Sequence, residues 1–427
     1  MKFIAKNYNK SKETIHNFMW QSLKIFGTQG VTFLIFIIAA KLLNQYEFGV
    51  YNYILAIVLF LTIFGDFGIS KATTKYVAEY NAIDKEKLRA VLFNSGIIIL
   101  GFTIFVAIAL LIFGKLYLKE NYIYAVYLLP LLFLAPIASL YDGIYGGLKR
   151  FKQLAAISAI SGILAVSFSY ILVLNYGLIG ALIAQILFYS VLVFLLALGY
   201  REFHLKINKS VIIEIGKYSL FFGLANLGYF LYTRVDIMVL GYFGYIKEIG
   251  YYEIVNKVFM LLLLPVTILG TVVAPNSTKD FVLGKFEHIK KKMISESLLL
   301  GCIGLLIALC GFFVFPLIFK AFLQEYDSLL LIKLLNILLV LIPLRFFSSY
   351  ISMAYIAPLG YIKIITKYLI IFGVINLILN LILINIIGFI GVIYATLISQ
   401  ILFIIFKDFI SFIPTVFKKI QSYPNSK

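Results

Sequence analysis

Runs of about twenty apolar residues, repeated along the whole chain, limit its possible folds more than any other feature. Twelve such runs can be read, at 22–43, 50–69, 90–113, 123–143, 153–174, 177–200, 215–240, 250–273, 294–319, 328–353, 364–386 and 389–413. About 20 residues let an α-helix cross the hydrocarbon core, where lipid offers backbone amides no partners. Strands of an outer-membrane barrel would be alternating segments of about 10 residues. We therefore predict an all-α integral membrane protein with twelve transmembrane helices.

Composition supports a membrane protein and argues against an enzyme. The chain is 62% hydrophobic and 13% charged, against about 45–50% and 25% in soluble domains. Cys302 and Cys310 lie in one apolar run, and His16, His204 and His288 fall in separate connections. These residues form neither a disulfide framework nor a metal-ligand cluster. With no catalytic triad and no phosphate-binding glycine loop, we expect no catalytic residues, no metal and no cofactor.

Basic residues predict the orientation in the membrane. With a cytoplasmic N-terminus, 28 of the 37 Lys and Arg residues fall on the cytoplasmic side, and Lys407 is counted with them. Cytoplasmic loops are enriched in Lys and Arg, so we predict a multi-pass protein of the cell membrane with both termini in the cytoplasm. The net charge of +18 is then a topology signal spread over short loops, and we expect no nucleic-acid partner.

The two halves of the sequence resemble each other. "GGLKRFKQLAAIS" from Gly146 aligns with "APLGYIKIITKYL" from Ala357, and "NQYEFGVYNY" aligns with "YIKEIGYYEI". Each half holds six spans, so a parallel pseudo-two-fold repeat of two six-helix bundles is predicted, as in several carrier folds. The predicted parts are a basic N-terminus (1–21), two bundles (22–200 and 215–413), a linker (201–214) and a tail (414–427). Two bundles with a water-accessible seam are typical of a transporter.

"LYTRVDIMVLG" at 231–241 places two charges inside an apolar run. Arg234 and Asp236 lie about 200° apart around a helix and cannot pair with each other. In the hairpin formed with the next span, Arg234 is level with Lys257, and Asp236 is level with Glu253. Glu253 and Lys257 are also spaced i, i+4, which favours an ion pair. The four charges either neutralise one another near the outer interface or line a cavity that meets an anionic substrate group or a coupling cation.

Two further charges are candidates for a site. Arg345, beside Pro343, lies toward the cytoplasmic side of its span and offers a second arginine to an anion. The alternative is a bundle-facing arginine paired with backbone carbonyls. Asp66, in "FGDFG", is either a coupling carboxylate or a residue that faces a loop.

The motif Arg234-x-Asp236-x4-Gly241, followed by Gly250-x-Tyr252 and Lys257, resembles the polysaccharide flippase family. These proteins are the oligosaccharide-lipid transporters of the multidrug/oligosaccharidyl-lipid/polysaccharide (MOP) superfamily. "GISKATTKYVAEY" and "VVAPNSTKD" match where that family has such segments, and the resemblance covers about 20–413. It implies a twelve-helix, MATE-like fold that moves a polyprenyl- or dolichyl-linked sugar to the outer leaflet. Arg234, Lys257 and Arg345 would hold the phosphate.

We therefore hypothesise that the protein is a flippase that moves a lipid-linked glycan across the membrane by alternating access. Asp236, Glu253 and Asp66 are its charge-pair or coupling candidates, and Na⁺ or H⁺ its candidate coupling ion. Membrane lipids and glycan-assembly enzymes are the expected partners. One alternative is a cation-coupled multidrug exporter, which would favour a carboxylate-rich cavity. The other is a membrane glycosyltransferase, which would normally need a larger external loop than any here.

Overall fold

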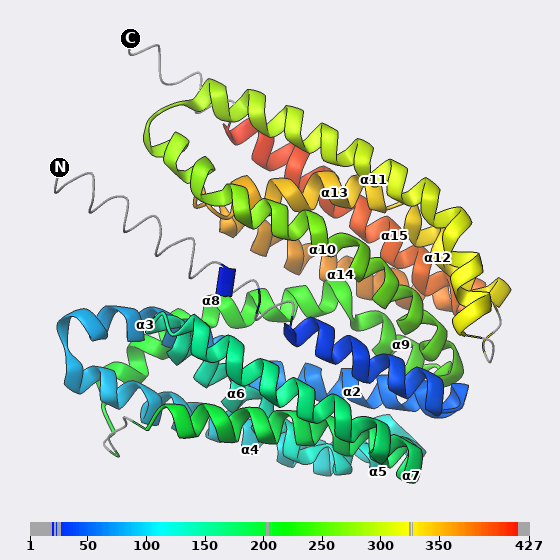
Figure 1. Cartoon of the computed structure of the whole chain (residues 1–427), viewed down its shortest axis with the longest axis horizontal. Coiled ribbons are helices and arrows are strands. Elements are labelled where there is room, and N and C mark those ends of the chain that lie inside the picture. The colour runs from blue at the N-terminus through cyan, green and yellow to red at the C-terminus, as the bar shows by residue number, and fades with distance from the viewer. Residues whose placement is uncertain are drawn as a thin grey trace. The chain divides into compact units, whose positions relative to one another are not determined.

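The computed structural model describes residues 19, 20, 23, 27–201, 205, 207–323, 326 and 328–416. Every regular element in these residues is a helix (Figure 1), so the prediction of a helical membrane protein is confirmed. The chain divides into two compact units, unit 1 (Met1–Asn226) and unit 2 (Leu227–Lys427). The predicted N-terminal segment 1–21 and tail 414–427 lie almost entirely outside the described residues.

The helices follow one another with short connections. Unit 1 contains the helix Gly27–Leu42, α2 (Gln45–Asp66), α3 (Ile69–Ile83), α4 (Lys85–Leu118), the 3₁₀ turn η1 (Lys119–Asn121), α5 (Tyr122–Tyr127), α6 (Leu129–Gly147) and α7 (Phe151–Gly199). Helix α8 (Lys209–Thr233) leads from unit 1 into unit 2. Unit 2 continues with α9 (Val235–Tyr242), α10 (Ile246–Val282), α11 (Phe286–Phe322), α12 (Ser328–Leu339), α13 (Ile342–Ile351), the π-helix η2 (Ser352–Ile356), α14 (Ile362–Ile387), α15 (Ile390–Ile404) and the π-helix η3 (Ile405–Phe412).

These elements accommodate the twelve predicted spans. Nine helices in the described residues are long and apolar enough to cross a membrane, and the bent pair Ser328–Leu339 and Ile342–Ile356 adds a tenth. Helix α7 contains two predicted spans, because its backbone leaves the helical conformation at Gly177 (φ 53°, ψ −131°). The shorter helix Gly27–Leu42 corresponds to the first span, whose predicted start lies outside the described residues.

The turn at Gly177 recurs in unit 2 at the offset of the sequence repeat. Gly388 lies 211 residues later (388 − 177) and has φ 67° and ψ −155°, a conformation open mainly to glycine. Each of these glycines is followed three residues later by another, Gly180 or Gly391, that packs against the backbone of the preceding helix. A Cβ added at Gly180 would lie 1.9 Å from the Leu172 carbonyl oxygen, and one added at Gly391 would lie 2.3 Å from that of Leu383. The helical hairpin that closes each half therefore has the same local structure in both.

Helix α8 is shared between the units, because the division between them falls between Asn226 and Leu227. Its first half packs in unit 1, where the Tyr80 hydroxyl of α3 donates a hydrogen bond to the Glu214 carboxylate. Burial, together with this carboxylate, raises the pKa of Tyr80 well above its usual value, so the phenol stays protonated at neutral pH. This contact fixes α3 against α8.

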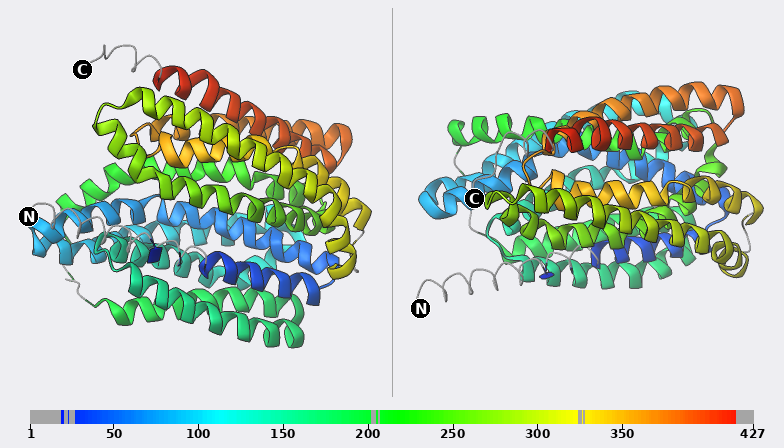
Figure 2. Two further views of the ribbon diagram at one scale, coloured as in Figure 1. Left: turned by 45° about the horizontal axis from the view of Figure 1, so that its top comes forward. Right: turned by 90° about the horizontal axis from the view of Figure 1, so that it is seen from above.

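Much of each unit's outward surface is apolar. The long helices of each unit run alongside one another in the different views (Figure 2), yet only 17% of the most apolar part of α11 is buried. Phe313 is 77% exposed and Leu317 is 71% exposed on that helix. In water such a surface would be costly, whereas acyl chains solvate it without penalty. The hydrophobic composition therefore reflects contact with lipid as well as a core.

Candidate functional site

The seventh span is interrupted at Arg234. Helix α8 ends at Thr233 and α9 begins at Val235, and Arg234 between them has φ −138° and ψ −11°. The apolar run predicted one continuous helix over 215–240, so the break is a feature that hydrophobicity did not reveal. Transporter folds commonly place substrate and ion sites at such discontinuous helices, because the interruption frees polar groups inside the membrane.

Arg234 belongs to an outer charge cluster, defined here as Arg234, Glu253, Asn256 and Lys257. Its Nη1 lies 2.7 Å and 2.9 Å from the two carboxylate oxygens of Glu253, and Asn256 Nδ2 donates to Glu253 Oε1 at 3.2 Å. Lys257 is half-buried and interacts electrostatically with both Glu253 and Arg234. The Glu253 side chain is 3% exposed and that of Arg234 is 33% exposed. Two cations thus share one buried carboxylate, and positive charge is in excess.

Asp236 lies apart from this cluster, in a network of neutral groups. Its carboxylate is fully buried and accepts hydrogen bonds from Tyr252 Oη, Asn376 Nδ2 (3.0 Å), Asn380 Nδ2 (2.7 Å) and Thr396 Oγ1 (2.9 Å). These donors come from α10, α14 and α15. Arg234 and Asp236 therefore do not pair with each other, and the structure separates Asp236 from the Glu253 with which the hairpin argument had grouped it.

The Asp236 network also contains oxygen atoms suited to a small cation. Asn380 Oδ1 is buried with no hydrogen-bond partner in the described part of the chain. An amide presents either its nitrogen or its oxygen when it rotates, and hard cations prefer carboxylate, amide and hydroxyl oxygens. No group of three or more His, Cys, Asp or Glu side chains suited to a metal occurs among the described residues. The Asp236 network thus combines one buried carboxylate with amide and hydroxyl oxygens.

Unit 1 keeps part of this network at the equivalent positions but has no carboxylate in the place of Asp236. Tyr51, which corresponds to Tyr252 in the sequence repeat, accepts a hydrogen bond of 2.6 Å from Gln185, which corresponds to Thr396. Ile35, in the place of Asp236, is fully buried. The tyrosine and its partner helix are therefore kept in both units, whereas the carboxylate is confined to unit 2.

A second, inner charge cluster consists of Arg345, Tyr232, Ser352, Lys407 and Asp408. Arg345 Nη1 donates to the Tyr232 hydroxyl at 3.2 Å, and Lys407 Nζ donates to Ser352 Oγ at 2.8 Å and forms an ion pair with Asp408. Arg345 interacts electrostatically with the Lys407–Asp408 pair. Arg345 Nε and Asp408 Oδ2 are buried without hydrogen-bond partners in the described residues. Here too, two cations share one carboxylate.

The Lys407–Asp408 pair is buried within unit 2. Counting basic residues places Lys407 on the cytoplasmic side, but its side chain is 1% exposed and that of Asp408 is fully buried. Both residues lie in the π-helix η3, and Lys407 reaches the π-helix η2 through Ser352. Wider π-helical turns are rare and are frequent at functional sites. The only sequence signal was a Lys-Asp pair inside the last predicted span.

Asp66 has a structural partner in unit 1. It is the last residue of α2, and its Oδ1 accepts hydrogen bonds from the backbone N–H of Ser70 (2.9 Å) and from the Ser70 hydroxyl. Ser70 lies in the first turn of α3, whose orphan N–H groups need acceptors. The carboxylate therefore stabilises the start of α3.

Comparison with known proteins agrees with this architecture. A model of the polysaccharide biosynthesis protein family matches residues 14–280, which is more than half of the chain. The chain belongs to this family. An uncharacterized membrane protein of Methanocaldococcus jannaschii is 28% identical over 399 residues, covering 88% of this chain and 92% of the relative.

Solved structures of the MOP superfamily share the fold. The lipid II flippase MurJ, in an inward closed conformation, superposes with a TM-score of 0.76 at 19% identity, covering 95% of this chain and 90% of its own. A multidrug resistance MATE family transporter in an inward-facing conformation gives a TM-score of 0.74 at 16% identity, covering 93% and 99%. A MOP superfamily transporter from Pyrococcus furiosus gives 0.61 at 16% identity, covering 95% and 96%. The predicted MATE-like fold is therefore confirmed.

Proposed function

We propose that the protein is a flippase that moves a lipid-linked oligosaccharide from the cytoplasmic to the outer leaflet by alternating access. Membership of the polysaccharide biosynthesis family supports this function, as does the fold shared with a lipid II flippase. The observation that carries the proposal is the excess positive charge of both clusters in the membrane-spanning helices of unit 2. Such a chain would work beside the enzymes that assemble the glycan.

The charge of the clusters favours an anionic headgroup. In the outer cluster, Arg234 and Lys257 outnumber Glu253, and in the inner cluster Arg345 and Lys407 outnumber Asp408. A buried cation in hydrocarbon needs a partner anion, and a polyprenyl or dolichyl phosphate supplies one. In this scheme Arg234, Lys257 and Arg345 bind the phosphate, with Arg234 and Arg345 serving it at different depths.

A multidrug exporter is the alternative that the shared MATE fold keeps open. A cationic drug would need a carboxylate that faces the transport path. Asp236 is fully buried and Glu253 is 3% exposed, and each is already held by several donors. The partly exposed charges in the outer cluster belong to Arg234 and Lys257, which favours an anion.

Ion coupling is assigned to Asp236 within this proposal. A Na⁺ ion or a proton would neutralise a carboxylate that is otherwise buried with its charge balanced only by neutral donors. Because α9, α10, α14 and α15 all contribute to the network, occupancy would change how these four helices pack. Such a packing change is the kind of two-state element that coupling requires.

The proposal is tested by transport in proteoliposomes. The substrate is a polyprenyl-diphosphate oligosaccharide with a fluorescent label on the sugar, and its exposure is measured with a membrane-impermeant quencher. Arg234→Ala and Arg345→Ala should each slow flipping about 10–100-fold, because a charge-assisted hydrogen bond contributes roughly 1.5–3 kcal/mol. Lys247→Ala, at an exposed position in the first turn of α10, serves as the control.

Two results would contradict the proposal. One is unchanged flipping by both arginine variants, when they are folded and inserted as well as the parent. The other is a parent protein that transports cationic drugs and leaves the labelled glycolipid in place. Complementation of a flippase-null strain by the same variants gives an independent readout in cells.

A further inference from the structure

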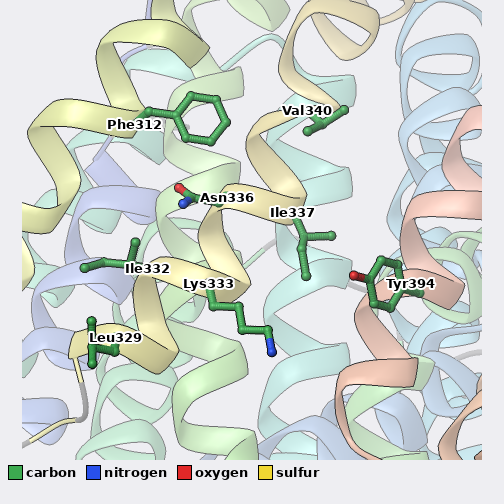
Figure 3. Close-up of a pocket in the computed structure, with 8 residues that line it drawn as sticks. All are labelled: Phe312, Leu329, Ile332, Lys333, Asn336, Ile337, Val340 and Tyr394. Carbon is green, nitrogen blue, oxygen red and sulfur yellow. The ribbon is translucent and has the colours of Figure 1, made fainter. Parts of the chain in front are cut away.

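Unit 2 has a groove on its surface whose lining residues take no part in the proposed transport mechanism. It is a shallow, open groove with a volume of about 550 Å³, formed by α11, α12 and α15 (Figure 3). Its lining residues are Phe312, Leu329, Ile332, Lys333, Asn336, Ile337, Val340 and Tyr394. Five of these eight are apolar aliphatic or phenylalanine side chains, so the walls suit a hydrocarbon chain.

Two polar side chains, Lys333 and Tyr394, lie on the same side of α12. Figure 3 shows the Lys333 side chain extending from α12 on the side of α15, where the Tyr394 hydroxyl points toward α12, whereas Asn336 points toward Phe312 of α11. Lys333 is exposed, and no hydrogen bond or ion pair joins it to another residue of the described chain. An ammonium group beside apolar walls, with a phenol close by, is complementary to an anionic headgroup such as a phosphate.

The surroundings of the groove are suited to acyl chains. Leu329 is 76% exposed and Val340 is 57% exposed. Phe312 lies on α11, whose neighbouring Phe313 is 77% exposed. Exposed apolar side chains on spanning helices contact lipid tails. An acyl chain in this groove would therefore be continuous with the lipid tails around α11, and it could enter from the bilayer without passing through water.

The groove continues from Lys333 to the end of α12. Lys333 and Val340 are seven residues apart in the sequence, a rise of about 10 Å along a helix, whereas half of the hydrocarbon core is about 15 Å. The groove ends at the break between α12 and the helix Ile342–Ile356, which are bent by 45°. The upper part of one lipid chain would lie along this stretch, and the rest would extend past the break into the surrounding lipid.

From these observations we infer that the groove binds one anionic phospholipid, with its phosphate at Lys333 and Tyr394 and one acyl chain along α12. In the orientation predicted from the basic residues, this lipid belongs to the outer leaflet. This site is independent of the glycan substrate and of the charge clusters.

The site is tested by lipid retention. The full-length protein is reconstituted in nanodiscs of phosphatidylcholine with 20% phosphatidylglycerol (on the order of the anionic lipid content that surface-potential effects require), extracted gently, and examined by native mass spectrometry. The parent should retain one phosphatidylglycerol in preference to phosphatidylcholine. Lys333→Gln should weaken this preference about fivefold, the effect of one lysine near a membrane surface.

Matched variants separate the groove from general attraction to the surface. Lys320→Gln removes an exposed lysine from the last turn of α11, outside the groove, and should leave retention unchanged. Ile337→Trp should fill the groove and release the lipid while Lys333 stays in place. Equal losses in the Lys333 and Lys320 variants would overturn the inference, as would retention by the Ile337 variant. Displacement of phosphatidylglycerol by an equimolar polyprenyl phosphate would overturn it in favour of the substrate's own lipid.

Discussion

The buried Lys407–Asp408 pair allows a sharp test of the inner cluster. The side chains of both residues are at most 1% exposed, and Arg345 interacts with them from α13. We consider replacement by apolar residues of similar size, Lys407→Met and Asp408→Leu, and the double replacement. Removing one partner of a buried pair typically costs about 3–5 kcal/mol, whereas replacing both is often close to neutral.

Arg345 should make the two single variants unequal. Asp408→Leu removes the carboxylate shared by the buried Lys407 and the half-buried Arg345, so the cost should be about 4–5 kcal/mol. Lys407→Met leaves Asp408 beside Arg345, and each of these has one buried polar atom without a partner in the described residues, Oδ2 and Nε. Asp408 then keeps its interactions with Ser348 and with the charge of Arg345, which reduces the expected cost to about 1–3 kcal/mol.

Thermal unfolding in detergent micelles, followed by near-UV circular dichroism, measures these differences. For a unit of about 200 residues, Asp408→Leu should lower Tm by roughly 10–15 °C, and the double variant should recover most of the loss. Lys363→Met, at an exposed position of α14, should change stability by less than about 0.5 kcal/mol. Equal costs for the two single variants, or a double variant as unstable as their sum, would refute the assignment of Arg345 as the second partner of Asp408.

Three further predictions follow from the other features. If Asp236 binds Na⁺, replacing choline chloride by NaCl at constant ionic strength should raise Tm of the parent. At a Na⁺ concentration 100 times Kd, the expected stabilisation is about 2.7 kcal/mol. Asp236→Asn should abolish the rise in Tm, and a rise that persists in this variant excludes Asp236 as the Na⁺ ligand. Glu253→Gln leaves Arg234 and Lys257 without their acid, so it should cost about 1–3 kcal/mol in chemical unfolding, part of which Arg234→Met in the same background should restore; no recovery would mean that repulsion is not the cause. Gly177→Ala and Gly388→Ala should each destabilise by about 1–3 kcal/mol because of their backbone conformation, whereas Gly216→Ala, with open space around it, should be neutral or stabilising; equal effects at all three positions would contradict the role of the positive φ.

The sequence alone predicted the membrane fold and its internal repeat, because both depend on local properties. A span needs about twenty apolar residues in succession, and that pattern is visible without any tertiary contact. The glycine turns at 177–180 and 388–391 repeat in sequence because their backbone conformation tolerates little else. The unusual charges Arg234, Asp236 and Arg345 were also visible, since a charge inside an apolar run stands out.

Only the tertiary structure decided which groups these charges meet. The hydrogen-bond partners of Asp236 include Asn380 and Thr396, which lie 144 and 160 residues away along the chain, and no helical spacing relates them. Lys407 was counted with the basic residues of the cytoplasmic side, and the structure shows its side chain buried in the π-helix η3 beside Asp408. Hydrophobic periodicity reports how deeply a helix is embedded, whereas the partner of a buried charge depends on which helices pack together.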